Sequence, residues 1–210
     1  EQKVGIATKA LLWRIEQLKT LKAKQAPILY MYGAFGLRLD PEELVFPHFI
    51  NRASISLGYI GCHEVLQVMF GKDVDTMNEQ SIKFIQKVLT YMRGVCDLYK
   101  DETGIGFSLY ATPSESLCDR FNRLDEKRYP DMHWLFEKGY YTNSHHLDVA
   151  RNVAPDVKFD YEANFTGIAS GGCISYVELP DMKRFPEALE WVIDHAASKV
   201  HYFGINTPVD

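Results

Sequence analysis

Hydroxyl side chains gather where an apolar run of the sequence is expected to lead into a helix. Thr112, Ser114 and Ser116 lie on either side of Pro113. The first N–H groups of a helix lack partners within the helix, and the positive end of its dipole lies there, so a phosphate would bind well. A plain helix cap, with Thr112 as the capping residue and Glu115 completing a capping box, fits the same residues. Both interpretations can hold, because a capped helix start can keep N–H groups free for an anion.

A second polar cluster lies in residues 140–146, where we expect a strand. With the two-residue alternation of a strand, Asn143 would face one side and His146 the other, and either side could line a polar cavity. Zinc binding would need a further ligand that the pattern does not name. A buried hydrogen-bonding network is therefore the favoured interpretation, and we expect no metal site.

Cys62 and His63 are adjacent, which suggests a catalytic thiol–imidazole pair. Adjacent residues on a helix or strand point apart, however, so a buried thiol beside a hydrogen-bonding His63 and Glu64 is favoured.

Arg52 is either a ligand for a phosphate or carboxylate or an exposed residue at the start of a strand. The cysteines include no CxxC pair, which favours reduced thiols over a zinc cluster: Cys62, Cys96, Cys118 and Cys173.

Helices and strands are expected to alternate along the chain. Apolar residues at three- and four-residue steps predict helices over 4–24 and 77–101, and turn residues predict others over 63–70, after Pro113 and over 186–199. Short apolar runs predict strands over 28–32, 54–58, 104–110, 140–149, 173–179 and 201–205. This order indicates an α/β fold with a mostly parallel sheet, in which ligands bind beyond the carboxyl ends of the strands.

Composition narrows the possible partners. The net charge of −5 gives no reason to expect nucleic-acid binding, and no run approaches the ~20 apolar residues that a membrane helix needs. No basic-then-apolar leader occurs, so we expect a cytoplasmic protein. The chain starts without Met, inside a helical pattern, and we interpret it as a fragment of a longer protein.

Six ordered blocks of sequence resemble the large subunit of the anaerobic, class III ribonucleoside-triphosphate reductases, a glycyl-radical family. The similarity is strongest to phage members and spans nearly the whole chain. The blocks are residues 26–31, 52–61, 106–115, 117–121, 139–144 and 202–208.

The resemblance implies a ten-stranded α/β barrel, of which residues 1–210 would form about the second half as a single partial catalytic domain. It implies reduction of ribonucleoside triphosphates at the 2′ carbon by a thiyl radical that a stored glycyl radical generates. Formate would be the reductant, ATP and deoxynucleotides the effectors, and zinc a further component of the parent enzyme. A radical-SAM iron–sulfur activase and a second copy of the enzyme would be its protein partners.

The resemblance also assigns roles to residues of this chain. Residues 112–116 match the family's substrate-phosphate loop, which makes Thr112, Ser114, Glu115 and Ser116 candidate substrate ligands, and Tyr110 and Glu115 match positions near the ribose. His63, Asn143 and His146 are the candidates for lining the pocket. The family's radical cysteine, four-cysteine zinc site and glycyl-radical loop match no residues here, and Cys62 is not the radical cysteine. The chain alone would therefore bind no cofactor and be inactive.

Two other functions remain open on the sequence. Another glycyl-radical enzyme, such as a formate-lyase relative, would share the barrel. A non-catalytic α/β module that binds phosphorylated ligands would share the anion-binding turn.

Overall fold

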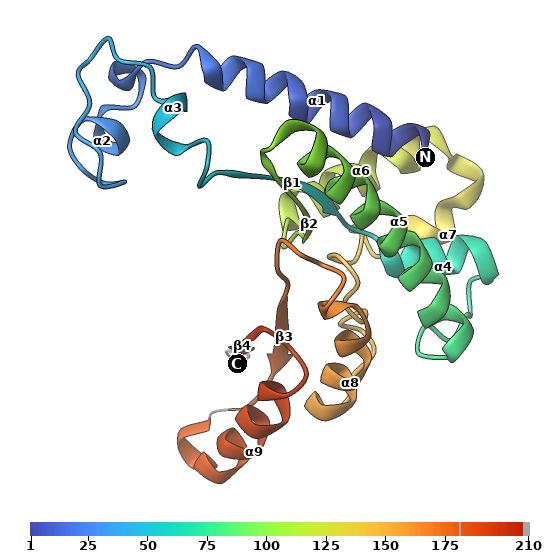
Figure 1. Cartoon of the computed structure of the whole chain (residues 1–210). Helices are drawn as coiled ribbons and strands as arrows, with labels where there is room; N and C mark the ends of the chain where they lie inside the picture. Colours follow the sequence, from blue (N-terminus) through green and yellow to red (C-terminus); the bar gives the residue numbers. More distant parts are fainter. Residues whose placement is uncertain (181, 208–210) are drawn as a thin grey trace. The chain divides into compact units, whose positions relative to one another are not determined.

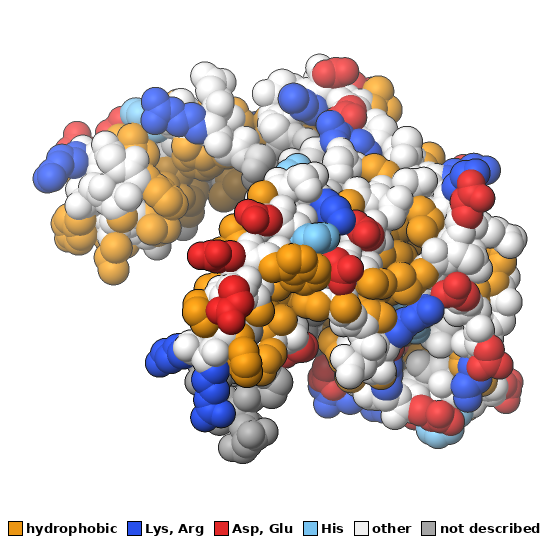
Figure 2. Space-filling view, turned by 90° about the horizontal axis from the view of Figure 1, so that it is seen from below, with side chains coloured by type: hydrophobic (Ala, Val, Ile, Leu, Met, Phe, Trp, Pro, Cys, Tyr) orange, Lys and Arg blue, Asp and Glu red, His pale blue; other side chains and the backbone are white. Residues whose placement is uncertain are grey.

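The computed structural model describes residues 1–180 and 182–207, and the chain divides into two compact units. Unit 1 comprises residues 1–57 and 95–108, and unit 2 comprises residues 58–94 and 109–210. Acidic and basic side chains are interspersed on the face seen in Figure 2. Within the described residues, no helix combines the length and the apolar character needed to cross a membrane. Pro208, which ends the last of the six sequence blocks, lies outside the described residues.

Unit 1 is built mainly of helices. They are α1 (Gln2–Lys19), the 3-10 turn η1 (Ala23–Gln25), α2 (Pro27–Tyr30), α3 (Phe46–Phe49) and the last turns of α5 (Glu79–Thr103). Ala23, Tyr30 and Val45 form a small buried core with partly buried apolar neighbours. The helix expected over 4–24 is confirmed as α1, although it ends at Lys19.

The strand expected over 28–32 is wrong, because these residues form the single turn of α2 and its end. Pro27 occupies the first helical position, and Met31 N–H donates to the Pro27 carbonyl at 2.8 Å. Ile28 is 70% exposed whereas Tyr30 is buried. A short apolar run does not distinguish a strand from a helical turn by its period alone.

Unit 2 contains the remaining elements (Figure 1). They are α4 (Cys62–Phe70), most of α5, α6 (Glu115–Arg128), η2 (Pro130–Met132), α7 (His133–Phe136), α8 (Pro155–Thr166), β3 (Ile174–Glu178), η3 (Met182–Arg184), α9 (Pro186–Ala197) and β4 (Tyr202–Asn206). β3 and β4 pair in parallel, from Ile174 opposite Tyr202 to Glu178 opposite Asn206, and α9 connects them. This β–α–β unit confirms the α/β interpretation.

One core cluster of unit 2 is formed by β3, β4 and the helices α8 and α9; Figure 1 shows these helices beside β3. Phe159 of α8, Val177 of β3 and Val192 of α9 are almost completely buried and belong to one cluster with Leu179 and Ala196. The two inward positions of β3 are Ser175 and Val177, as a strand with one covered face requires. The other face of β3 is thereby left free to line a cavity.

The strands β1 (Ser54–Tyr59) and β2 (Gly106–Ala111) are hydrogen-bonded neighbours, and each runs from unit 1 into unit 2. The sequence prediction is confirmed for both strands, for β3 and β4, and for α4, α5 and α9, with ends that move by a few residues. The helix expected after Pro113 is confirmed as α6.

Two parts of unit 2 differ from expectation. The strand predicted over 140–149 is instead an irregular segment, the polar loop (residues 139–149), whose backbone turns at Gly139 (φ 78°) and Ser144 (φ 43°). The helix α8 was not predicted, because its buried residues include the polar Glu162 and Thr166, which interrupt the apolar stripe in the sequence. Pro155 at its first turn, followed by Asp156, was the available signal.

Gly58 of β1 provides a test of how closely the strand pair approaches the start of α6. A Cβ atom at Gly58 would lie 2.2 Å from Oγ1 and 3.4 Å from Cβ of Thr112. We expect Gly58→Ala to lower the free energy of unfolding of the complete polypeptide by about 1–3 kcal/mol in denaturant titrations, because Thr112 must move. Gly94→Ala is the control: nothing lies within 4 Å of its Cβ position in α5, and alanine should stabilise the helix. Equal stability of Gly58→Ala and the parent protein would contradict the close contact.

Candidate functional site

The start of α6 is capped from a distant part of the chain. The predicted capping box is wrong: Ser114 is the N-cap residue, its side chain makes no capping hydrogen bond, and Thr112 Oγ1 donates to the Tyr110 carbonyl at 3.2 Å. Asn143 of the polar loop supplies the cap instead. Its Oδ1 accepts the Ser114 N–H at 3.0 Å and the Cys118 thiol at 3.0 Å.

This cap leaves N–H groups at the helix start available. Leu117 and Cys118 N–H both donate to the Ser114 carbonyl. No described residue accepts the N–H of Glu115 or Ser116, and both residues are exposed. Two adjacent donors at the positive end of a 14-residue helix are suited to an anion.

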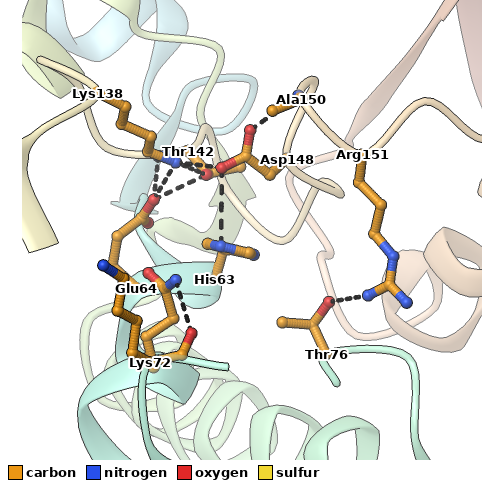
Figure 3. A network of polar contacts seen from close by, with 10 residues as sticks. His63, Glu64, Lys72, Thr76, Lys138, Thr142, Asp148, Ala150 and Arg151 are labelled. Carbon is orange, nitrogen blue, oxygen red and sulfur yellow. Dashed lines mark hydrogen bonds and ion pairs between the residues drawn. The ribbon is translucent and has the colours of Figure 1, made fainter. Parts of the chain in front are cut away.

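The polar loop is held in place by a buried ion-pair cluster (Figure 3). Glu64 of α4 is 3% exposed, and its Oε1 accepts Thr142 N–H at 3.0 Å and Thr142 Oγ1–H at 2.8 Å. The Lys138 ammonium lies 2.5 Å from the same Oε1 and 2.6 Å from Asp148 Oδ2. Both ends of the loop are thereby tied to one carboxylate.

Charges in this cluster support one another. Burial raises the pKa of Asp148, but Lys138 and the Ala150 N–H outweigh it and hold that pKa below its usual value. Burial lowers the pKa of Lys138, but the two carboxylates outweigh it and raise that pKa. Asp148 and Lys138 are therefore both ionised at neutral pH.

His63, Glu64 and Asp148 could together hold a metal ion, since each offers a ligand atom within 4.8 Å of the others. The Lys138 ammonium already lies between the two carboxylates. Burial also lowers the pKa of His63, whose Nε2 is 3.6 Å from Asp148 Oδ2. This arrangement is a salt-bridge network, and we assign no metal to it.

A second network orients His146. Its Nδ1 lies 2.9 Å from Oε1 of Glu162, a residue of α8 that is 1% exposed. Glu162 also accepts the Ser175 hydroxyl, and Lys158 Nζ lies 3.6 Å from Oε1. Burial raises the pKa of Glu162, but these partners outweigh it and hold that pKa below its usual value. The carboxylate is therefore ionised.

The neighbouring His145 has a different role. Its Nδ1 is 2.6 Å from the Tyr59 hydroxyl, and the residue is 1% exposed. Burial lowers the pKa of His145 to about 3, so its imidazole is neutral and forms part of the buried core. The buried network expected for this segment is present.

The polar loop borders a cavity of about 720 Å³ in unit 2, within the size range of small-molecule sites. Of the predicted site residues, Glu115, Asn143 and His146 line it, whereas Tyr110, Thr112, Ser114, Ser116 and His63 do not. The sequence analysis missed other polar lining residues, which include Asp148, Arg151, Asn152, Lys158, Tyr176, Glu178 and Asn206. Lys158 lies on the unpredicted α8, and Glu178 and Asn206 end the two paired strands.

The family model for anaerobic ribonucleoside-triphosphate reductase matches residues 1–210. The chain belongs to this family. Anaerobic ribonucleoside-triphosphate reductases of Salmonella typhimurium and Escherichia coli are 46% and 47% identical over the whole of this chain, and that of Enterobacteria phage T4 is 45% identical. The chain spans about 30% of the length of the two bacterial relatives and 33% of the phage relative.

Solved reductase structures have the same fold. The Thermotoga maritima anaerobic ribonucleotide reductase with glycerol in its active site matches 97% of this chain at a TM-score of 0.66 and 20% identity. The same enzyme with dATP in its specificity site matches 97% at a TM-score of 0.70. This chain corresponds to 31% and 32% of those chains. The α/β fold as part of a larger reductase barrel is therefore confirmed.

The ion-pair cluster can be tested through Lys138. We expect Lys138→Met to lower the free energy of unfolding by about 3–5 kcal/mol at neutral pH, because the buried carboxylate of Glu64 and that of Asp148 would lose the cation between them. Since the pKa of Asp148 is held below its usual value, the deficit should shrink as pH falls through that pKa. Denaturant titrations at several pH values measure both effects.

Lys83→Met is the matched control for this substitution. The Lys83–Glu79 pair is 69% and 81% exposed, so its removal should leave the stability nearly unchanged. If the two methionine variants were equally stable, the cluster would not anchor the loop.

Proposed function

We propose that this chain forms part of the substrate pocket of an anaerobic ribonucleoside-triphosphate reductase, which reduces ribonucleoside triphosphates to deoxyribonucleoside triphosphates. The observation that carries the proposal is the pair of unpartnered N–H groups at Glu115 and Ser116, beside a cavity of about 720 Å³, in a chain that matches the family throughout. These donors would bind phosphate oxygens, and the cavity would take the rest of the nucleotide.

Each predicted residue has a place in this proposal. Ser116 and Glu115 contribute backbone donors, and Asn143 fixes the helix start through Ser114. The Glu115 carboxylate lines the cavity, which agrees with a position near the ribose. Tyr110 and Thr112 hold the turn before the helix. A carboxylate beside a phosphate is repulsive, so Glu115 must point away from the bound anion.

Formate as reductant, a glycyl radical, zinc and nucleotide effectors are parts of the proposal that rest on family membership. So are a radical-SAM activase, a homodimer and a cytoplasmic location. The zinc of the family finds no cysteine cluster among the described residues, where Cys62, Cys96, Cys118 and Cys173 are separate buried thiols. We therefore assign this chain the binding and orientation of the nucleotide, with no step of the radical chemistry.

A non-catalytic module for phosphorylated ligands is the second candidate, because the anion-binding helix start alone would suit it. The family match over all 210 residues favours the reductase, over this module and over a formate-lyase relative. Activase-dependent reduction of CTP by the complete polypeptide separates the three.

Ser116→Asp tests the phosphate site. The new carboxylate should weaken CTP binding about tenfold or more in the complete polypeptide, measured by calorimetry with dATP present, because it repels the phosphates. A carboxylate in the first turn interacts favourably with the helix dipole, so the melting temperature should not fall. Ser116→Asn is the isosteric neutral control and should retain affinity. If Ser116→Asp bound CTP as tightly as Ser116→Asn, the phosphate assignment would be wrong.

Ser114→Pro is a less specific test of the phosphate site, because it also removes the hydrogen bond from the Ser114 N–H to Asn143.

Cys62 provides a test of the radical chemistry. It is 6% exposed, and burial raises the pKa of its thiol. We expect Cys62→Ala to retain activase-dependent CTP reduction, with a small loss of stability from the lost packing. Complete loss of turnover in a variant that folds and binds CTP would identify Cys62 as a radical carrier instead.

A further inference from the structure

The imidazole of His146 stands between a buried carboxylate and the cavity. Glu162 holds Nδ1 from the core side and does not line the cavity, whereas His146 does. No described residue bonds to Nε2, and Nε2 is not fully buried. The free ring nitrogen therefore keeps access to the cavity.

Glu162 has partners besides His146. The Ser175 hydroxyl donates to Oε2, and the Lys158 ammonium lies 3.6 Å from Oε1, so α8 and β3 also compensate the buried charge. The Glu162 carboxylate in turn constrains His146: an ionised carboxylate accepts only, so Nδ1 carries the proton that it donates to Glu162. Nε2 is then the ring nitrogen that is left to bond to a group in the cavity.

We infer that His146 binds a hydrogen-bonding group of the nucleotide through Nε2, and that Glu162 is its positioning residue. This inference rests on the proposed function, because the cavity must hold the nucleotide. The Nε2 atom can bond to a hydroxyl or amino group. Arg151 and Asp148 also line the cavity, but they are less free to bond to the nucleotide, because Arg151 pairs with Asp75 and Asp148 pairs with Lys138.

Asparagine and glutamine at position 146 separate this role from a structural one. The asparagine amide reproduces the place of Nδ1 and can still bond to Glu162, but it removes the atom at the place of Nε2. The glutamine amide reaches the place of Nε2. We expect His146→Asn to weaken CTP binding about fivefold or more and His146→Gln to stay within about threefold of the parent protein, as the loss of one hydrogen bond predicts.

The measurement is CTP calorimetry on the complete polypeptide with dATP present, the nucleotide pair bound in the Thermotoga maritima enzyme. His195→Asn is the control, because His195 contacts Trp191 on α9 and does not line the cavity. A purely structural His146 predicts the reverse order, with the asparagine variant binding CTP normally. That result would overturn the inference.

Glu162→Gln tests the positioning role. It should weaken CTP binding in the parent background and have no further effect on CTP binding in His146→Asn, because Glu162 acts through His146. Additive losses would contradict the role of Glu162.

The proposed function itself would fail if CTP bound weakly to every variant at position 146 and bound equally well to Ser116→Asp and Ser116→Asn. Only this inference would fail if Ser116→Asp weakened CTP binding as expected while His146→Asn bound CTP as tightly as the parent protein.

Discussion

The buried contact between Glu64 and Lys138 is the constraint on which the site depends. The polar loop has almost no regular backbone pairing, so side chains determine its path. One carboxylate on α4 receives the Thr142 backbone, the Thr142 hydroxyl and the ammonium, and the ammonium reaches Asp148 at the other end of the loop. An isolated buried charge is costly, but three donors that converge on one carboxylate oxygen fix a single loop geometry.

A neutral cap on α6 follows from that geometry. A serine or aspartate side chain that capped the helix locally would accept the N–H of Ser116 or Leu117, and an aspartate would add a negative charge where an anion is to bind. Asn143 instead accepts the Ser114 N–H with an uncharged amide from 29 residues away. The donors of Glu115 and Ser116 remain free. Helix stability and anion binding therefore do not compete for the same groups.

Local patterns account for what could be predicted from the sequence. The apolar stripe of α5 and the runs of β3 and β4 have clear periods, so their positions followed from the residues alone. The polar loop could not be predicted, because its partner Glu64 lies 78 residues from Thr142. Alternation placed Asn143 and His146 on opposite sides of a strand. The turn at Ser144, with φ of 43°, brings both to one cavity.

The charges around the cavity indicate how a nucleotide would be recognised. Arg151 is paired with Asp75, and Lys158 faces Glu162, so the cations that line the cavity are already compensated. A triphosphate therefore has little net positive charge to bind there and is better matched by the helix start. The cavity wall offers hydrogen-bonding groups of fixed orientation, from His146 to Asn143. Such groups discriminate between ligands by geometry, because an unmatched buried donor or acceptor costs more than a surface ion pair contributes.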